Sequence, residues 1–130
     1  MRLAIVALLS GALVAMPALA QRLAGVSDRE TTIPNAGRGG ITALVFGRGD
    51  VMFVRDRRNK WYRVALNSGC FKHRKSDMGA DQTRFLIGYD GTFDRMSMIR
   101  TRSAGPCAVT SIRRSLAPPQ VDRRSPVTLD

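Results

Sequence analysis

Apolar and polar positions follow one another in short runs through the middle of the chain, which is typical of β-strands rather than of helices. The first two runs are Ile41 to Phe46 and Val51 to Arg55, and the loop Gly47 to Asp50 joins them. Apolar side chains fall on both faces of each run, so we expect a hairpin that is buried on two sides or that lies at a barrel corner. If all four loop residues lie outside the ladder, Phe46 pairs with Val51.

The next run alternates more regularly. A turn over Asp56 to Lys60 leads into a predicted strand from Trp61 to Leu66. The apolar face of this strand is expected to carry Tyr62, Val64 and Leu66. The other face is expected to carry Trp61, Arg63 and Ala65.

After Cys70 the alternation lapses and then resumes. Phe71 to Thr83 is polar and basic, which predicts a loop or a short helix. Arg84 to Tyr89 predicts a strand, and Asp90-Gly91 predicts a hairpin turn, after which Phe93 to Arg100 returns antiparallel. Cys107 to Arg113 predicts a last strand or a short helix.

Proline is absent from Ile41 to Gly105, which lets every backbone N–H of this stretch join a sheet ladder. The pattern therefore predicts an all-β or mainly β domain over residues 41–114, a small antiparallel barrel or roll of five to six strands. Cys70 and Cys107 form an even pair, which in an oxidising compartment predicts one disulfide. The alternative is two free thiols with a redox or metal-binding role.

The segments on either side of this domain have a different composition. Gln21 to Gly40 is polar and interrupted by glycine and proline, which predicts a flexible leader with a short helical turn near Ser27 to Glu30. Ser115 to Asp130 contains three prolines and few apolar residues. Because such a segment buries too little surface to offset its ordering entropy, we predict a disordered tail over residues 115–130.

Residues 1–20 have the features of a signal peptide. Arg2 gives a positive start, Leu3 to Ala15 is mainly apolar, and Pro17 ends any helix. Ala18-Leu19-Ala20 has the small-x-small pattern that signal peptidase cleaves, so we predict cleavage after Ala20 and a periplasmic or secreted protein. A retained membrane anchor is the alternative, although the apolar stretch is only about the minimum length for a span, roughly 18 residues.

Charge changes the range of partners that we consider. Without Arg2, the chain carries 20 basic and 10 acidic residues, a net charge of +10. Such a surface attracts anionic lipid headgroups, acidic polymers and acidic proteins. Nucleic acid is not the expected partner of an exported protein. The alternative interpretation is that the excess charge only keeps the protein soluble.

The most distinctive segment is Arg55 to Arg63, because eight basic residues and one acidic residue lie between Arg55 and Lys75. Guanidinium groups bind carboxylates and phosphates through paired hydrogen bonds, and Trp61 adds a flat apolar surface. The predicted binding face comprises Arg55, Arg57, Arg58, Lys60, Trp61, Arg63, Lys72, Arg74 and Lys75. The alternative is a solvated hairpin tip, with Trp61 or Tyr62 in the core.

The sequence shows no arrangement that would indicate catalysis or a cofactor. His73 is the single histidine, and together with Cys70 it gives too few ligands for a structural zinc site, so we predict neither a metal nor another cofactor. Asp90 and Asp94 flank a turn, where aspartate is common for turn chemistry alone. We therefore predict no catalytic residues.

The sequence Trp61-Tyr62-Arg63 with a cysteine a few residues later resembles a family of small exported proteobacterial proteins of unknown function. The likeness covers Asp50 to Ile112 and rests on Val54-Arg55-Asp56, Trp61-Tyr62-Arg63, Leu66, Cys70, Ile87-Gly88-Tyr89, Asp94-Arg95 and Cys107. Phe71 to Thr83 departs from the family's pattern because it is longer and more basic. The resemblance implies a Gram-negative envelope location and a bridge between the two cysteines. It implies no activity.

These observations lead to one principal hypothesis and two alternatives. The principal hypothesis is a non-enzymatic periplasmic or secreted domain that binds an anionic partner through the basic hairpin. The first alternative is an envelope structural or inhibitor-like module that acts through the Trp61 face. The second is a small hydrolase or redox protein.

Overall fold

The structure is a computed structural model that describes residues 25–47, 49–71, 83–101 and 106–118. Within these residues it contains strands and no helix, which confirms the predicted all-β class. The strands are β1 (Val26–Glu30), β2 (Ile41–Phe46), β3 (Val51–Asp56), β4 (Trp61–Leu66), β5 (Thr83–Leu86), β6 (Met98–Thr101) and β7 (Cys107–Ser115).

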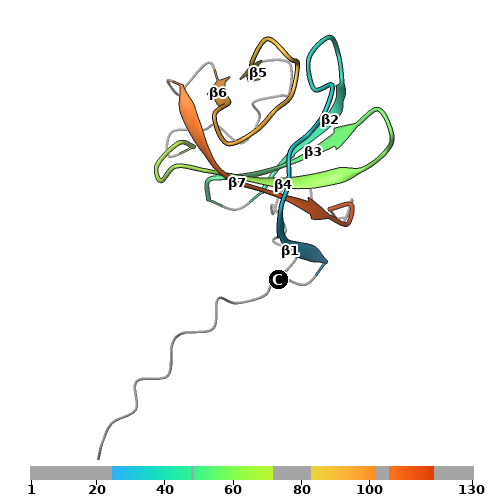
Figure 1. The fold of residues 1–130 in the computed structure, drawn as a ribbon. Coiled ribbons are helices and arrows are strands. Elements are labelled where there is room, and N and C mark those ends of the chain that lie inside the picture. Colours follow the sequence, from blue (N-terminus) through green and yellow to red (C-terminus); the bar gives the residue numbers. More distant parts are fainter. Residues whose placement is uncertain (1–24, 48, 72–82, 102–105, 119–130) are drawn as a thin grey trace, which may run out of the picture.

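The strands form one antiparallel sheet in the order β2-β3-β4-β7-β6-β5, and β1, which lies off this path, also pairs with β7. Figure 1 shows that this sheet curls into a half-barrel, with β2 and β5 at its two ends. The antiparallel barrel or roll that the sequence predicts is therefore confirmed. The described strands number seven rather than five or six, and β1 is the strand that the sequence pattern did not predict.

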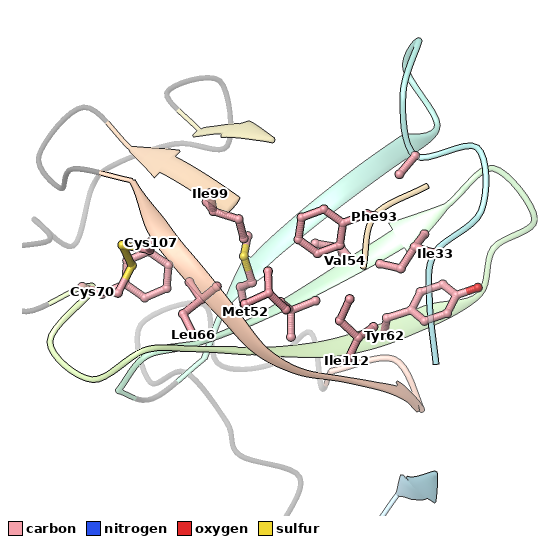
Figure 2. Close-up of a cluster of buried hydrophobic side chains, with 14 residues drawn as sticks. Ile33, Met52, Val54, Tyr62, Leu66, Cys70, Phe93, Ile99, Cys107 and Ile112 are labelled. Carbon is pink, nitrogen blue, oxygen red and sulfur yellow. A yellow bond between two sulfur atoms is a disulfide. The ribbon is translucent and has the colours of Figure 1, made fainter. Parts of the chain in front are cut away.

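β4 has the predicted boundaries and facing, whereas β3 begins as predicted but extends one residue further, to Asp56. Tyr62, Val64 and Leu66 are buried, while the intervening residues of β4 are half-buried. The buried face of β4 meets Met52 and Val54 of β3, and neither residue is exposed at all. Figure 2 shows these side chains gathered inside the curve of the sheet.

The β2–β3 hairpin differs from the predicted register by one residue. The Gly47 N–H donates to the Val51 carbonyl oxygen at 2.7 Å, so Phe46 pairs with Met52 and not with Val51. Gly47 thus extends the ladder instead of lying in the loop. A Cβ at this position would approach the Phe53 ring at 3.2 Å, so glycine suits this closely packed site.

The expected two-sided burial holds for β3, since Phe53, on the face opposite Met52 and Val54, is also fully buried. Residues of β2 are at most half-buried.

The chain between β5 and β6 is not the short hairpin that Asp90-Gly91 predicted. Leu86 pairs with Met98, so residues 87–97 all lie in the connection, and the strand expected from Phe93 begins only at Met98. A turn does form there, because the Gly91 N–H donates to the Gly88 carbonyl oxygen at 3.0 Å. The chain then leaves the sheet, since Phe93 is fully buried and exchanges two backbone hydrogen bonds with Ile33.

The predicted flexible leader is part of the folded domain from residue 25 onward. The helical turn expected near Ser27 is wrong, because Val26–Glu30 is a strand that pairs with β7. The Glu30 carboxylate anchors this strand: it accepts hydrogen bonds from the Ser111 hydroxyl at 2.7 Å and the Ile112 N–H at 2.9 Å. It also accepts one from the Arg113 Nε at 3.0 Å.

The predicted disulfide between Cys70 and Cys107 is confirmed, with the two Cα atoms 5.7 Å apart. It joins the loop after β4 to the start of β7. The Asp50 carboxylate holds that loop by accepting hydrogen bonds from the N–H groups of Gly69 and Phe71, each at 2.8 Å.

Several predictions concern residues outside the described ranges. They include the signal peptide and its cleavage after Ala20, most of the loop or short helix predicted over Phe71 to Thr83, and the tail beyond residue 118. Thr83 itself begins β5 and does not belong to that loop. The described part of the tail begins as strand, since β7 continues to Ser115. No described helix has the length and apolar character that crossing a membrane requires.

Candidate functional site

The β3–β4 turn lies against one side of an open cleft of about 470 Å³, which we call the arginine cleft. Its walls come from three separate segments: the turn after β3, the loop before β2, and the connection between β5 and β6. The lining residues are Pro34, Asn35, Gly37, Arg38, Gly40, Asp56, Arg57, Arg58, Tyr89, Asp90 and Gly91. Three arginines from two segments therefore meet at one hollow.

Arg57 joins the turn to the glycine-rich loop before β2. Its Nε donates to the Gly39 carbonyl oxygen at 3.1 Å, and its Nη2 donates to the Arg38 carbonyl oxygen. A guanidinium group has five N–H donors in a planar fork, so Arg57 keeps further donors beside the cleft. These contacts fix the position of an exposed cation without neutralising it.

Arg38 and Arg58 are also exposed, and neither forms an ion pair with another described residue. The backbone of Arg38 is in the left-handed region, with φ of 53°. The N–H of Arg58 donates to the Asp56 carboxylate at 2.8 Å, which fixes the start of its side chain. Both guanidinium groups are thus available to an anion at the cleft.

Asp56 organises the turn from within. It is only 5% exposed, and its Oδ1 accepts hydrogen bonds from the N–H groups of Arg58 and of Lys60, the latter at 3.0 Å. Its Oδ2 accepts the Tyr62 hydroxyl proton at 3.1 Å. Burial acts to raise the pKa of this carboxyl group, but these hydrogen bonds and the charge of Arg114 outweigh burial and leave the pKa below its ordinary value.

Tyr62 and Arg114 complete this buried network at the end of the sheet. The Arg114 guanidinium lies 5.2 Å from the centre of the Tyr62 ring, and its Nη1 donates to the hydroxyl oxygen at 3.4 Å. Burial and the hydrogen bond to Asp56 raise the pKa of Tyr62, so its hydroxyl remains a donor at neutral pH. The Asp56 carboxylate is consequently engaged by hydrogen bonds within the protein.

Asp90 is the other acidic residue among the described residues that line the cleft. It is exposed, and it accepts the Thr92 N–H at 3.0 Å. Three exposed arginines against one exposed carboxylate leave the accessible surface of the arginine cleft predominantly basic.

The predicted binding residues are divided between two surfaces. Arg57 and Arg58 line the arginine cleft, and exposed Lys60 closes the same turn. The outer face of the sheet carries Arg55, Trp61 and Arg63. The opposite, inner face of the same strands packs against the core. Lys72, Arg74 and Lys75 lie outside the described residues, as does His73.

On the outer face, Arg55 and Trp61 are a cross-strand pair. The Arg55 guanidinium carbon lies 5.8 Å from the centre of the indole ring, and the Arg55 Nε donates to the Thr42 hydroxyl at 3.3 Å. Trp61 is half-buried. The indole is therefore engaged by a neighbouring side chain on one side and is only partly accessible to a partner.

Arg38, which lines the arginine cleft, and Arg114, which contacts Tyr62, are basic residues that the sequence pattern did not assign to a site. The signal for Arg38 was the run Gly37-Arg38-Gly39-Gly40, in which an arginine stands among residues that favour tight loops. Arg114 carried no local signal, since only the pairing of β4 with β7 brings it to Tyr62.

Neither a catalytic group nor a metal centre is evident in the described ranges. Asp94 accepts hydrogen bonds from the Met96 N–H at 2.8 Å and the Ser97 N–H at 3.1 Å, so it serves the turn, as Asp90 does. The described residues contain no group of three or more histidine, cysteine and acidic side chains that would hold a metal ion.

No family model matches this chain, and no curated protein and no solved structure matches it. Its function must therefore be inferred from its own geometry.

Proposed function

We propose that the protein is an exported, non-enzymatic β-domain that binds an anionic partner at the arginine cleft. The observation that carries the proposal is the meeting of Arg38, Arg57 and Arg58 at one hollow, with Arg57 fixed by the backbone of the loop opposite. Guanidinium groups held in this way suit phosphate and carboxylate groups, because both accept paired hydrogen bonds.

The charge of the whole chain supports the same partner class. A formal net charge of +11 attracts polyanions over distances greater than a direct contact. Lys60, beside the cleft, would extend the basic surface. In the envelope of a Gram-negative cell, lipid headgroups and acidic polymers offer such groups. The two sources share one chemistry, and binding to each is measured separately below.

The test compares two double variants that remove equal charge. Arg57→Ser/Arg58→Ser alters the arginine cleft, and Arg29→Ser/Arg95→Ser removes two exposed arginines that do not line it. Binding to vesicles of phosphatidylglycerol and to linear polyphosphate is measured at low ionic strength. We expect the cleft variant to bind at least about tenfold more weakly than the control, since hydrogen bonds to charged groups contribute about 1.5–3 kcal/mol each.

Three results would contradict the arginine cleft as the binding site, and they come from the two double variants, from high salt and from a Trp61 variant. Equal weakening of both double variants would mean diffuse attraction and would refute the cleft as a site. Binding that persists in about 1 M salt, where screening acts over roughly 3 Å, would also refute it. If that salt-resistant binding is lost in Trp61→Ala while Arg57→Ser/Arg58→Ser retains it, the partner is recognised by the outer aromatic surface instead.

A further inference from the structure

A second hollow lies where the half-barrel stays open. β2 and β5 are the two ends of the strand order, and a groove of about 390 Å³ runs between them. We call it the seam groove. It is lined by Ala36, Gly37, Arg38, Gly39, Ile41, Thr42, Ala43, Leu44, Thr83, Phe85 and Ile87. Of the residues that the structure describes, only Gly37 and Arg38 line both this groove and the arginine cleft.

The hydrogen-bond pattern of β2 directs a peptide group of this strand into the groove. In an antiparallel pair, residues that exchange hydrogen bonds alternate with residues that do not. Because Gly47 donates to Val51, the peptide groups of Val45 and Ala43 also face β3. The N–H and C=O of Leu44, between them, therefore point away from β3 and toward the seam.

The same reasoning applies to β5. The Val109 N–H donates to the Ser97 carbonyl oxygen at 3.4 Å, so Ser97 and Ile99 face β7, and Met98 faces β5. Leu86, the partner of Met98, then bonds to β6, which leaves the peptide group of Phe85 directed toward the seam.

A polar side-chain atom also lies unsatisfied at this groove. The Thr83 Oγ1 is buried and has no hydrogen-bond partner among the described residues. A buried hydroxyl without a partner is costly, so an additional donor or acceptor arriving in the groove would stabilise it.

The side chains on the two rims define what would fit between them. Leu44 and Phe85 pack against the core, and the Phe85 ring meets the Phe93 ring edge-on at 5.5 Å. Arg84 alternates with Phe85 and is exposed, and Arg38 lines the groove, whereas no acidic residue in the described part of the chain lines it. A strand lying here would present alternate side chains to an apolar interior and to a basic exterior.

We infer that the seam groove is a docking site for an extended segment of an acidic partner protein, in which apolar and acidic residues alternate and which adds to the sheet as a strand. Addition of a strand to an open sheet edge is an established mode of peptide recognition. A second copy of this chain is disfavoured as the occupant, because each copy has a formal net charge of +11 and would bring further arginines to the same rim.

The test uses a fluorescent eight-residue peptide of alternating valine and glutamate. A control peptide has the same composition but groups the four valines and the four glutamates into two blocks. Binding is measured by fluorescence anisotropy at low ionic strength. We expect the alternating peptide to bind at least about tenfold more tightly, since only it can meet both the apolar and the basic side of the groove while forming backbone hydrogen bonds. Equal binding of the two peptides would overturn the inference.

Backbone N-methylation distinguishes strand addition from charge attraction. The valine N–H groups of an extended peptide point to one edge and the glutamate N–H groups to the other. Methylating either set of N–H groups leaves the charge of the peptide unchanged. We expect methylation of at least one of the two sets to weaken binding about tenfold or more. If methylation of each set separately weakens binding, the peptide inserts between β2 and β5. If methylation of one set alone weakens binding, the peptide adds to a single edge. No loss from either set would refute strand addition.

Two protein variants locate the site and separate it from the arginine cleft. Arg84→Glu, at the seam, is expected to weaken binding of the alternating peptide about tenfold, whereas Arg58→Glu, at the cleft, is expected to leave it within about twofold. Polyphosphate binding should show the reverse order, so either proposal can fail alone. Sedimentation of the purified protein as a dimer that dissociates in Leu44→Lys would assign the groove to a second copy and overturn the inference.

Discussion

Replacing Asp56 with alanine tests whether one buried carboxylate holds the β3–β4 turn. The substitution removes the acceptor of the Arg58 N–H, the Lys60 N–H and the Tyr62 hydroxyl, at 2.8, 3.0 and 3.1 Å. The two turn amides lie close to solvent and regain hydrogen bonds with water. The Tyr62 hydroxyl, on a residue that is 3% exposed, does not regain its partner as readily.

An unsatisfied buried group costs about 1–3 kcal/mol, and each lost hydrogen bond of the turn costs about 0.5–1.5 kcal/mol. We therefore expect Asp56→Ala to lower the free energy of unfolding by about 3 kcal/mol. Urea unfolding, followed by the fluorescence of the single tryptophan, Trp61, measures it. Asp90→Ala is the matched control, because it removes one exposed turn bond, and we expect a loss below about 1 kcal/mol.

The pH dependence gives this prediction a second readout. The pKa of Asp56 is lowered in the folded protein, so its contribution to stability is present above its unfolded pKa, about 3.9, and is lost as the pH falls through the lower, folded value. Asp56→Ala should therefore lose less stability than the wild type on acidification below about pH 4. An unfolding free energy within about 0.5 kcal/mol of the wild type at pH 7, or an unchanged acid profile, would refute this role for Asp56.

Three further substitutions probe the rest of the fold by the same unfolding measurement. Cys70→Ser/Cys107→Ser should cost about 4 kcal/mol, the loop-entropy value for a separation of 37 residues; a loss below about 1 kcal/mol would contradict it. Gly40→Ala should prevent native folding, because its Cβ would lie 1.6 Å from the Asn35 carbonyl oxygen, whereas Gly37→Ala, with only an ordinary contact at 3.6 Å, should fold. Glu30→Gln should cost about 1 kcal/mol, and unchanged stability would mean that this carboxylate does not anchor β1.

Local pattern was sufficient to predict β3 and β4, because the alternation in Trp61 to Leu66 matches the burial that the structure shows. The disulfide followed from the even number of cysteines together with the oxidising compartment that the features of residues 1–20 predict. The strand β1 could not be predicted in this way, since Val26 is its only apolar residue and its anchor, Glu30, binds residues far along the chain. The predicted register of β2 was wrong for a local reason. Gly47, which we expected in the turn, pairs with Val51 and so belongs to the ladder.

Only one wall of the arginine cleft was predictable from the sequence. A basic turn is visible in the sequence, so Arg57 and Arg58 were identified. The opposite wall of the arginine cleft was not, because Arg38 lies in a segment whose polar, glycine-rich composition suggested a leader. What places Arg38 there is the backbone pairing of Ile33 with Phe93, a contact between segments far apart in the sequence.

The position of β7 in the sheet affects how the protein reaches its folded form. β7 follows the other described strands along the chain, yet β1, β4 and β6 all pair with it. A polypeptide that emerges amino end first, from a ribosome or through a translocation pore, presents those three strands before their common partner arrives. Because the strand that β1, β4 and β6 share is synthesised last of the described strands, products that stop short of residue 107 should be degraded by proteases rather than accumulate as partly folded domains.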